Sequence, residues 1–404
     1  MPVVGLIGTL DTKGQEYAFL RDRLQEAGVE VLVIDAGIHE PVGLDPDVPR
    51  DEVARAAGND VAELAAAGDR GAAVTAMAAG TEVIVRTLYD EGRIDGLLAL
   101  GGSGGSSIAA PAMRALPVGV PKLLVSTVAS GDTRPYVGAV DVTMMYSVVD
   151  ISGVNRVSAR IMANAAGAIA GMVGASVPES EGKPLVAATM FGVTTPCVTT
   201  ARERLEEHGY EVLVFHATGA GGQSMEALAK DGFLAGVLDA TTTELADELV
   251  GGVLSAGPDR LEAAGAAGVP QVVSLGALDM VNFGPRESVP SRFDDRNLYV
   301  HNPTITLMRT TPEECGELGR TIGRKLSAAT GPTVLFIPEG GVSMIAVPGQ
   351  PFHDPDADDA LIAGLHETLD DSVEVHARSE DINDPAYATA MADRLHELIQ
   401  AARA

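Results

Sequence analysis

The sequence predicts an α/β protein of two domains, each a mostly parallel sheet flanked by helices. Short apolar runs alternate with helical segments along most of the 404 residues, as they do in parallel sheets covered by helices. The chain has 46 glycines and only 4% aromatic residues, which suits tight strand-to-helix turns better than an all-β sandwich. The polar, proline-bounded segment 176–184 is the best linker. We therefore expect domains at residues 1–178 and 179–404.

The first domain opens with a strand, a helix and a second strand. Apolar runs at 3–7 and 29–34 flank a segment with helical spacing, which Gly28 closes. An alanine-rich helical stretch at 51–91 follows, and strands are expected at 97–100 and 122–126. Glycines are expected to break the alanine-rich stretch at four positions, Gly58, Gly68, Gly71 and Gly80.

A helix at 155–173 ends the first domain and carries a stripe of small residues. The stripe is made of Ala159, Ala163, Ala166 and Ala170. Such a stripe permits close packing, either inside the domain or across a dimer. Together with the long aperiodic segment 276–306, which is typical of a functional loop or an interface arm, it predicts a homodimer.

The second domain repeats the rhythm of short strands and helices. Its apolar runs are at 185–190, 210–215, 234–238, 271–275 and 333–337. These runs predict a second parallel sheet whose turns lie at one edge.

Charge and targeting signals narrow the functional classes. Acidic residues outnumber basic ones 56 to 28, for a formal net charge of −28. Such a surface repels phosphate backbones and anionic lipid, which argues against nucleic-acid and membrane partners but allows a local cationic pocket. The two cysteines are far apart, and no leader or long apolar window is present, so we expect a cytoplasmic protein.

Three turns of the first domain follow predicted strands and bring polar groups to one sheet edge, where α/β proteins bind ligands. The glycine turn at 101–107 lets the backbone approach an anion closely, although a bare tight turn would look the same. Asp35, at the end of the second strand, could accept a hydrogen bond from a ribose hydroxyl or could serve as a helix or turn cap. The candidate nucleotide-binding residues are Thr9, Asp11, Thr12, Lys13, Asp35, Gly101, Gly102, Ser103, Gly104, Gly105, Ser106, Ser130, Gly131, Asp132 and Asn155.

Polar residues also follow the strands of the second domain. The candidate catalytic residues are His216, Asp239, Asp279, His301 and Glu339. They could supply acid–base chemistry or a divalent metal site, yet no pair has strong metal-ligand spacing, and each could be a cap or turn residue. We expect the strand before His216 to abut those ending near Phe191 and Asp239. Cys197 could be a reactive thiolate at a helix start or a packed apolar residue.

Long motifs resemble the UPF0261 (Tm-1-like) family over nearly the whole chain. They include GTLDTKG, GGSGGSS, STVASGDT, SVVDISGVNRVS, MFGVTTPCV, HATGAGGQSMEAL, DATTTELAD, LGALDMVNFGP, HNPTITLMRTT and HDPDADDAL. The resemblance implies two Rossmann-like domains, a homodimer and ATP binding in the N-terminal domain. It implies no reaction.

Two functional hypotheses follow. In the first, the chain is an ATP-using enzyme acting on an unidentified small molecule in a cleft between the domains. Lys13 would then neutralise phosphate charge, the glycine-turn amides would cradle phosphates, and Asp11 or Asp132 would hold a bridging Mg²⁺. In the second, the chain is a regulatory or interaction module whose dimer is stabilised by ATP. The polar second domain favours the enzyme.

Overall fold

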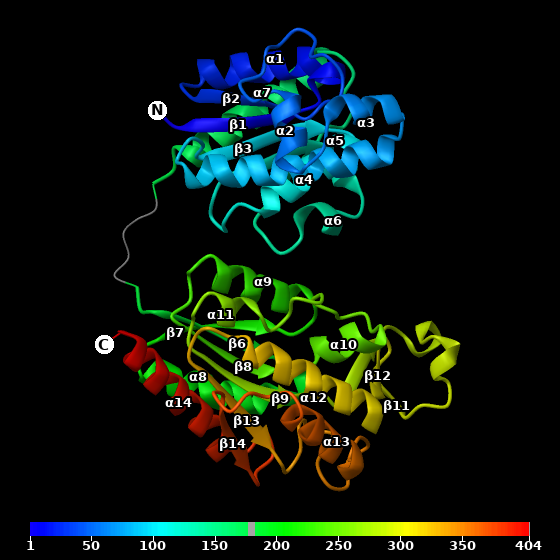
Figure 1. Cartoon of the computed structure of the whole chain (residues 1–404), viewed down its shortest axis with the longest axis vertical. Coiled ribbons are helices and arrows are strands. Elements are labelled where there is room, and N and C mark those ends of the chain that lie inside the picture. The colour runs from blue at the N-terminus through cyan, green and yellow to red at the C-terminus, as the bar shows by residue number, and fades with distance from the viewer. Residues whose placement is uncertain (177–181, 404) are drawn as a thin grey trace. The chain divides into compact units, whose positions relative to one another are not determined.

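The computed structural model describes residues 1–176 and 182–403. The chain divides into two compact units, Met1–Glu179 and Ser180–Ala404. Each unit is a parallel sheet with helices on both faces (Figure 1), which confirms the predicted fold class. The predicted linker, 176–184, falls largely outside the described residues.

The N-terminal unit is built on a five-stranded parallel sheet in the order β2-β1-β3-β4-β5. Its strands are β1 (Val3–Gly8), β2 (Glu30–Asp35), β3 (Gly96–Gly101), β4 (Lys122–Ser126) and β5 (Thr143–Tyr146). The three inner strands, β1, β3 and β4, are mostly apolar and almost wholly buried because both faces of the sheet are covered.

Helices cover this sheet on both faces. Helices α1 (Leu10–Glu26) and α7 (Arg156–Val173) pack on one face. The other face carries α2 (Arg50–Ala56), α4 (Arg70–Asp90) and α5 (Ser103–Arg114). Two short helices, α3 (Val61–Ala67) and α6 (Arg134–Val137), complete the unit. The adjacent strands β1 and β3 therefore send their helices, α1 and α5, to opposite faces, which makes their boundary a topological switch point.

The alanine-rich stretch is broken at two of the four predicted glycines. Gly58 and Gly68 have φ angles of 72° and 65°; Gly58 lies two residues after the end of α2, and Gly68 directly follows α3. The predicted breaks at Gly71 and Gly80 are wrong, because both residues lie inside α4. A Cβ at Gly80 would lie 2.0 Å from the carbonyl oxygen of Val53, so this glycine lets α4 approach α2 closely.

The C-terminal unit is built on a six-stranded parallel sheet in the order β14-β13-β9-β8-β6-β7. Its strands are β6 (Leu185–Met190), β7 (Glu211–His216), β8 (Gly236–Thr241), β9 (Gln271–Gly276), β13 (Thr333–Pro338) and β14 (Glu374–Arg378). Helices α8 (Thr195–Glu207) and α14 (Pro385–Arg403) cover one face. The opposite face carries α9 (Ala220–Lys230), α10 (Glu244–Val250), α11 (Ala263–Ala266), α12 (Pro312–Ser327) and α13 (Pro355–His366).

The segment 276–306 contains strands rather than the expected loop. Strands β10 (Met280–Phe283), β11 (Leu298–Asn302) and β12 (Ile305–Arg309) form a small antiparallel sheet in the order β10-β12-β11. Strand β10 is buried at every position, whereas β11 is partly or fully exposed throughout. Neither strand alternates between apolar and polar residues, so the usual strand pattern is missing from the sequence.

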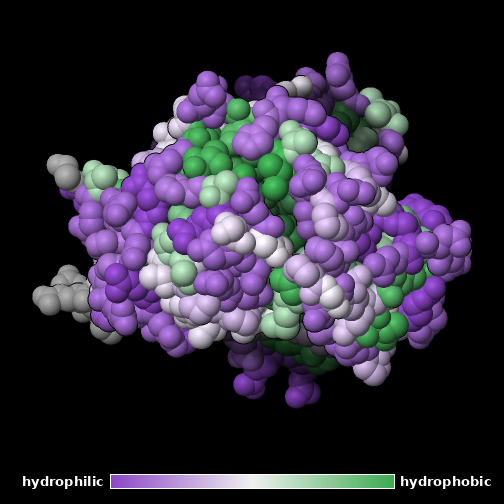
Figure 2. All heavy atoms as spheres, turned by 90° about the horizontal axis from the view of Figure 1, so that it is seen from below, coloured by the Kyte–Doolittle hydropathy of each residue, from purple (hydrophilic) through white to green (hydrophobic). Residues whose placement is uncertain are grey.

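Hydrophilic side chains cover most of the face shown in Figure 2, with smaller apolar areas between them. This distribution accords with the net charge of −28. Among residues 1–176 and 182–403, no helix combines the length and the hydropathy needed to span a bilayer.

Candidate functional site

The candidate site is a cavity of about 590 Å³ in the N-terminal unit, at the switch point between β1 and β3. The turns after these two strands form part of its wall, and the loop after β2, the α3–α4 region and Asp150 contribute to the remainder. The cavity brings together the predicted residues Thr9, Asp11, Thr12, Lys13, Gly101, Gly102, Ser103, Gly104 and Gly105.

The glycine turn opens α5 without a side-chain cap. Gly102 is the N-cap residue, with an extended backbone (φ −77°, ψ −161°), and glycine offers no side chain to cap the helix. A Cβ at Gly101 would lie 2.8 Å from the Cα of Gly105, so the tight turn requires glycine there. The first N–H groups of α5 therefore have no capping side chain, and the residues that carry them line the cavity, an arrangement typical of anion-binding helix termini.

Lys13 brings a positive charge to this site from the opposite face of the sheet. Its backbone leaves the helical region (φ −129°, ψ 15°) within α1. Its ammonium donates a hydrogen bond to the carbonyl oxygen of Ile151. The hydroxyls of Thr9 and Thr12 lie 3.0 Å apart beside it. An ammonium has three donors, so two remain for a ligand.

Two predicted carboxylates organise the cavity wall. Asp11 Oδ2 accepts hydrogen bonds from the N–H groups of Ile38 and His39 at 3.2 and 3.1 Å, and its buried Oδ1 has no partner among the described residues. Asp35 is fully buried, and its Oδ1 accepts from Leu10 and Gly37 at 3.2 and 2.9 Å. Burial raises the pKa of Asp35. Asp35 thus lies behind the wall and caps the chain there, outside the set of residues that line the cavity.

The remaining predicted residues of this unit also lie outside the lining. Ser106 is buried, with its Oγ 2.6 Å from the Oγ of Ser126. Exposed Asp132 pairs with Arg134 at 2.7 Å, and this hydrogen bonding lowers the pKa of Asp132 to about 2. Asn155 caps α7 by accepting from two backbone N–H groups, in a capping box. Ser130 and Gly131 complete the predicted residues that do not line the cavity.

Sequence reasoning missed the wall that α3 and α4 supply. Its residues, together with the β2 loop and Asp150, are Gly37, Ile38, His39, Ala65, Gly68, Asp69, Arg70, Ala73, Val74, Met77 and Asp150. One signal was available. Gly68 followed by Asp69 reads as a helix-ending glycine and a helix-starting cap, and Asp69 does accept from the N–H groups of Gly71 and Ala72.

The five candidate catalytic residues do not meet in the C-terminal unit. His216 is exposed at the end of the edge strand β7. The expectation that its strand abuts both neighbours is only half right, because β6 lies between β7 and β8, the strand of Asp239. His301 is exposed on β11 of the small sheet.

Asp239 belongs to a buried ion cluster around Arg260. Asp239 and Glu244 are almost fully buried and bond to the Arg260 guanidinium, and Glu226 bonds to it from the edge. Glu244 Oε1 also accepts from the N–H groups of Gly219 and Gly222 at 2.7 and 3.0 Å, so the cluster fixes the turn after β7. Burial raises the pKa of Glu244.

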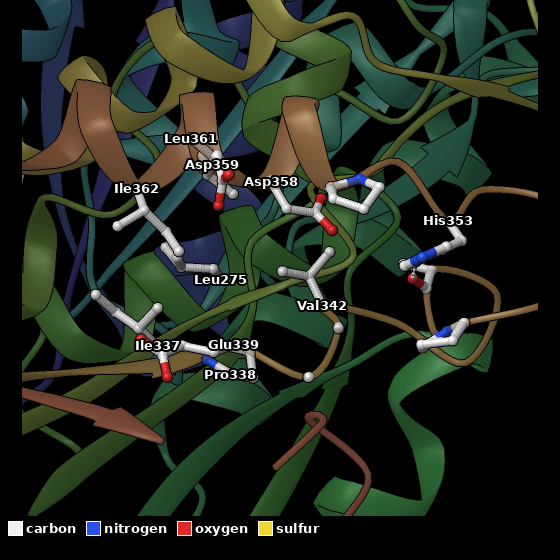
Figure 3. Close-up of a pocket in the computed structure, with 15 residues that line it drawn as sticks. Leu275, Ile337, Pro338, Glu339, Val342, His353, Asp358, Asp359, Leu361 and Ile362 are labelled. Atoms are coloured by element: carbon white, nitrogen blue, oxygen red, sulfur yellow. Dashed lines mark hydrogen bonds between the residues drawn. The ribbon is translucent and has the colours of Figure 1, made fainter. Parts of the chain in front are cut away.

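A second cavity, of about 310 Å³, lies where β9 and β13 end against α13 (Figure 3). Asp358 and Asp359 reach it from α13, and Glu339 reaches it from the end of β13. Asp358 is paired with Arg309 at 2.7 Å. Of the five candidate catalytic residues, only Glu339 lines this cavity.

Asp279 and Cys197 are closed off from solvent. Asp279 Oδ2 accepts from the Ser343 hydroxyl at 2.7 Å. Burial raises the pKa of Asp279 to about 6, against the opposing effect of Arg309. Burial also raises the pKa of Cys197 to about 12, so this cysteine is a packed residue rather than a thiolate. Within the described part of the chain, no three His, Cys, Asp or Glu side chains are grouped to hold a metal.

Comparison with known proteins gives family matches over both units. The model described as "Uncharacterised protein family (UPF0261) N-terminal domain" matches residues 2–178, and the corresponding C-terminal domain model matches residues 183–399. A UPF0261 protein of Clostridium tetani is 54% identical over 98% of each chain. The ToMV resistance protein Tm-1(GCR237) of Solanum lycopersicum is 40% identical over 98% of this chain but only 56% of its own length.

Solved structures resemble the chain only distantly. A putative UDP-N-acetylglucosamine 2-epimerase from Listeria monocytogenes matches 67% of this chain and 78% of its own, with 12% identity and a TM-score of 0.24. A likeness at this level carries no inference about function.

Proposed function

We propose that this chain, which belongs to the UPF0261 family, binds ATP in the switch-point cavity of its N-terminal unit. The observation that carries the proposal is the uncapped start of α5, whose glycine turn lines a cavity of about 590 Å³. Ligands of open α/β sheets bind at such a switch point, and phosphates bind at helix N-termini.

The rest of the cavity suits the other parts of the nucleotide. Lys13 can contact a phosphate with its two remaining donors. Ala65, Val74 and Met77 give the α3–α4 wall an apolar surface, against which a purine base can lie. The ligand is thus expected to place its phosphates at α5 and its base toward α4.

The cavity also offers a ligand for Mg²⁺. Protein-bound Mg²⁺ usually takes one or two carboxylates together with waters and substrate phosphates. Asp11 lines the cavity, and its buried Oδ1 has no partner among the described residues, so Asp11 fits this role. Asp132, the other predicted metal ligand, lies outside the lining. Bound Mg²⁺ would neutralise phosphate charge beside the acidic wall.

The arrangement of the C-terminal unit favours a protein that binds ATP without transferring a phosphate to a second substrate. His216, His301 and Glu339 are exposed at different strand ends, Asp239 is already paired with Arg260, and Asp279 is closed off. An ATP-using enzyme remains the second candidate, because the cavity beside Glu339 could hold a small molecule.

Calorimetric titration of the full chain with ATP, in Mg²⁺ and then in EDTA, tests the proposal. Saturable binding of one ATP per chain, stronger with Mg²⁺, is the expected result. No heat and no shift in melting temperature at millimolar ATP would contradict it, because a ligand that binds the native state must stabilise it.

Phosphate release and a metabolite thermal-shift screen separate the two candidates. The screen compares wild type with Glu339→Gln, and with His216→Ala as a strand-end control outside the cavity. A metabolite whose stabilisation is lost only in Glu339→Gln, with ATP hydrolysis dependent on it, would favour the enzyme. ATP binding without hydrolysis or such a metabolite is expected for the binding role.

A further inference from the structure

Arg70 is an unpaired cation at the edge of the nucleotide cavity. It is the first residue of α4, it is exposed, and it lines the cavity. No hydrogen bond or ion pair involves its guanidinium in residues 1–176 and 182–403. Arg86 on the same helix pairs with Asp90 at 2.9 Å. The chain has twice as many acidic as basic residues, so most arginines can find a carboxylate partner. An arginine without one, at the wall of a cavity, is therefore a candidate to bind an anionic ligand.

The guanidinium lies over the glycine turn. A Cβ built on Gly104 would be 3.3 Å from Arg70 Nη2. Gly104 is in the first turn of α5, whose N–H groups lack a side-chain cap. The Arg70 donors and the α5 N–H groups therefore converge on the same part of the cavity.

The nearby carboxylates do not occupy Arg70. Asp69 accepts from Gly71 and Ala72, Asp11 accepts from Ile38 and His39, and Asp150 Oδ1 accepts from Ile151. Each of the three accepts from backbone N–H groups, and none is paired with Arg70. The five donors of Arg70 therefore have no side-chain acceptor among the described residues and are available to a ligand.

Arg70 and Lys13 approach from opposite faces of the sheet. Lys13 belongs to α1, which packs with α7, and Arg70 belongs to α4, which packs with α5. One phosphate can be held by the start of α5 alone. A second and third phosphate extend beyond that helix start, where a forked cation forms charge-assisted bonds with them.

We propose that Arg70 binds the β- and γ-phosphates and makes the site selective for nucleoside di- and triphosphates over monophosphates. This inference rests on the proposed function, since it requires a nucleotide in the cavity. Arg70 would then set which nucleotides bind, whereas the glycine turn would hold the phosphate common to all of them.

Titration of the full chain with AMP, ADP and ATP, for wild type, Arg70→Ala and Arg70→Lys, tests the proposal. Arg70→Ala should weaken ATP and ADP binding by about 10- to 100-fold and AMP binding by less than about 3-fold, since a charged hydrogen bond is lost only with the longer ligands. Arg70→Lys should recover part of the loss. The unliganded melting temperature should stay unchanged because Arg70 is exposed.

Arg93→Ala is the matched control, since it also removes one positive charge. Arg93 precedes β3, at the other end of the strand from the glycine turn, and its partner is Glu91 at 3.6 Å. Equal losses for all three nucleotides in Arg70→Ala, no loss at all, or wild-type AMP binding as tight as ATP binding would overturn the inference alone. Wild-type protein that binds none of the three would overturn the proposed function itself.

Discussion

Arg260 and Asp239 form a two-point ion pair inside the C-terminal unit, with Nη1 2.5 Å from Oδ2 and Nη2 2.7 Å from Oδ1. Neither side chain is more than 2% exposed. Arg260 Nε also lies 2.7 Å from Glu244, which holds the turn after β7. Asp239, which the sequence offered as a candidate catalytic carboxylate, is thus part of a buried ion cluster that connects β8 with α10.

Replacing Arg260 by Met should destabilise the C-terminal unit strongly. The change leaves Asp239 and Glu244 buried without their cation, which typically costs about 3–5 kcal/mol. Urea unfolding followed by circular dichroism measures the loss. Arg286→Met is the matched control, because Arg286 forms an exposed pair with Asp294 at 3.4 Å, worth about 0–1 kcal/mol. Equal stability of the two variants would mean that the cluster contributes little.

Gly104→Val should abolish ATP binding and leave the protein folded. Gly104 has no left-handed backbone, and the nearest atom to an added Cβ is the flexible end of Arg70 at 3.3 Å, so the branched side chain enters the proposed phosphate site without meeting backbone. Calorimetry with ATP measures the loss. Gly167→Val on α7 is the control, since nothing lies within 4 Å of a Cβ there. Unchanged ATP affinity in Gly104→Val would reduce the glycine turn to a structural feature.

The buried carboxyl of Asp279 should make the C-terminal unit less stable as pH rises. Its pKa is raised by burial from 3.8 to about 6, so the folded state holds a proton that the unfolded state has lost between these values. The stabilisation is complete below the unfolded pKa and disappears as pH rises through the folded one. Relative to Asp279→Asn, the free energy of unfolding of the wild type should fall by up to about 3 kcal/mol between about pH 4 and about pH 6.

Urea unfolding at several pH values checks this difference. Asp371→Asn, at an exposed position, is the control for the loss of one carboxylate. A difference between wild type and Asp279→Asn that stays constant with pH would rule out the titration of Asp279 in this window.

The homodimer stays a prediction, and the structure suggests where to test it. Of the four α7 stripe residues, Ala166 is buried within its own unit and the other three are only partly exposed. The second basis for the dimer, the segment 276–306, offers the more exposed surface. Val300 is 55% exposed on β11, at the edge of the small sheet, and exposed edge strands can pair with another chain. Light scattering should give about twice 41.6 kDa for wild type.

Val300→Lys should lower the mass measured by light scattering toward that of a single chain, because a charged residue on an edge strand opposes pairing with another strand. Val253→Lys is the control, since Val253 is 63% exposed and lies outside the strands. A wild-type mass of one chain, with and without ATP, would remove the dimer from consideration.

The sequence predicted the parallel sheets well because buried parallel strands are continuous apolar runs. It missed β5 and β14, whose side chains are at most half-buried, and the three strands of the small antiparallel sheet. Among the predicted site residues, the glycine turn and Lys13 do line the cavity of the N-terminal unit. Arg70 was missed because α4 approaches α5 only through packing on a shared sheet face, which no spacing along the chain reveals.

Asp35 and Asn155 illustrate the opposite error. Asp35 ends β2 and Asn155 immediately precedes α7, positions where ligand-binding residues are common, yet both use their side-chain oxygens to satisfy backbone N–H groups. Short polar side chains at such positions serve as caps and as ligands alike, and the sequence alone does not distinguish the two uses.

Helix α14 has a consequence for the order in which the protein folds during synthesis. Through Tyr387, Met391, Leu395 and Ile399 it covers one face of the six-stranded sheet. The C-terminal unit therefore cannot close its core until the ribosome has made the chain as far as about residue 399. The N-terminal unit has all its strands and helices by Val173, so it can fold while the remainder is still being translated.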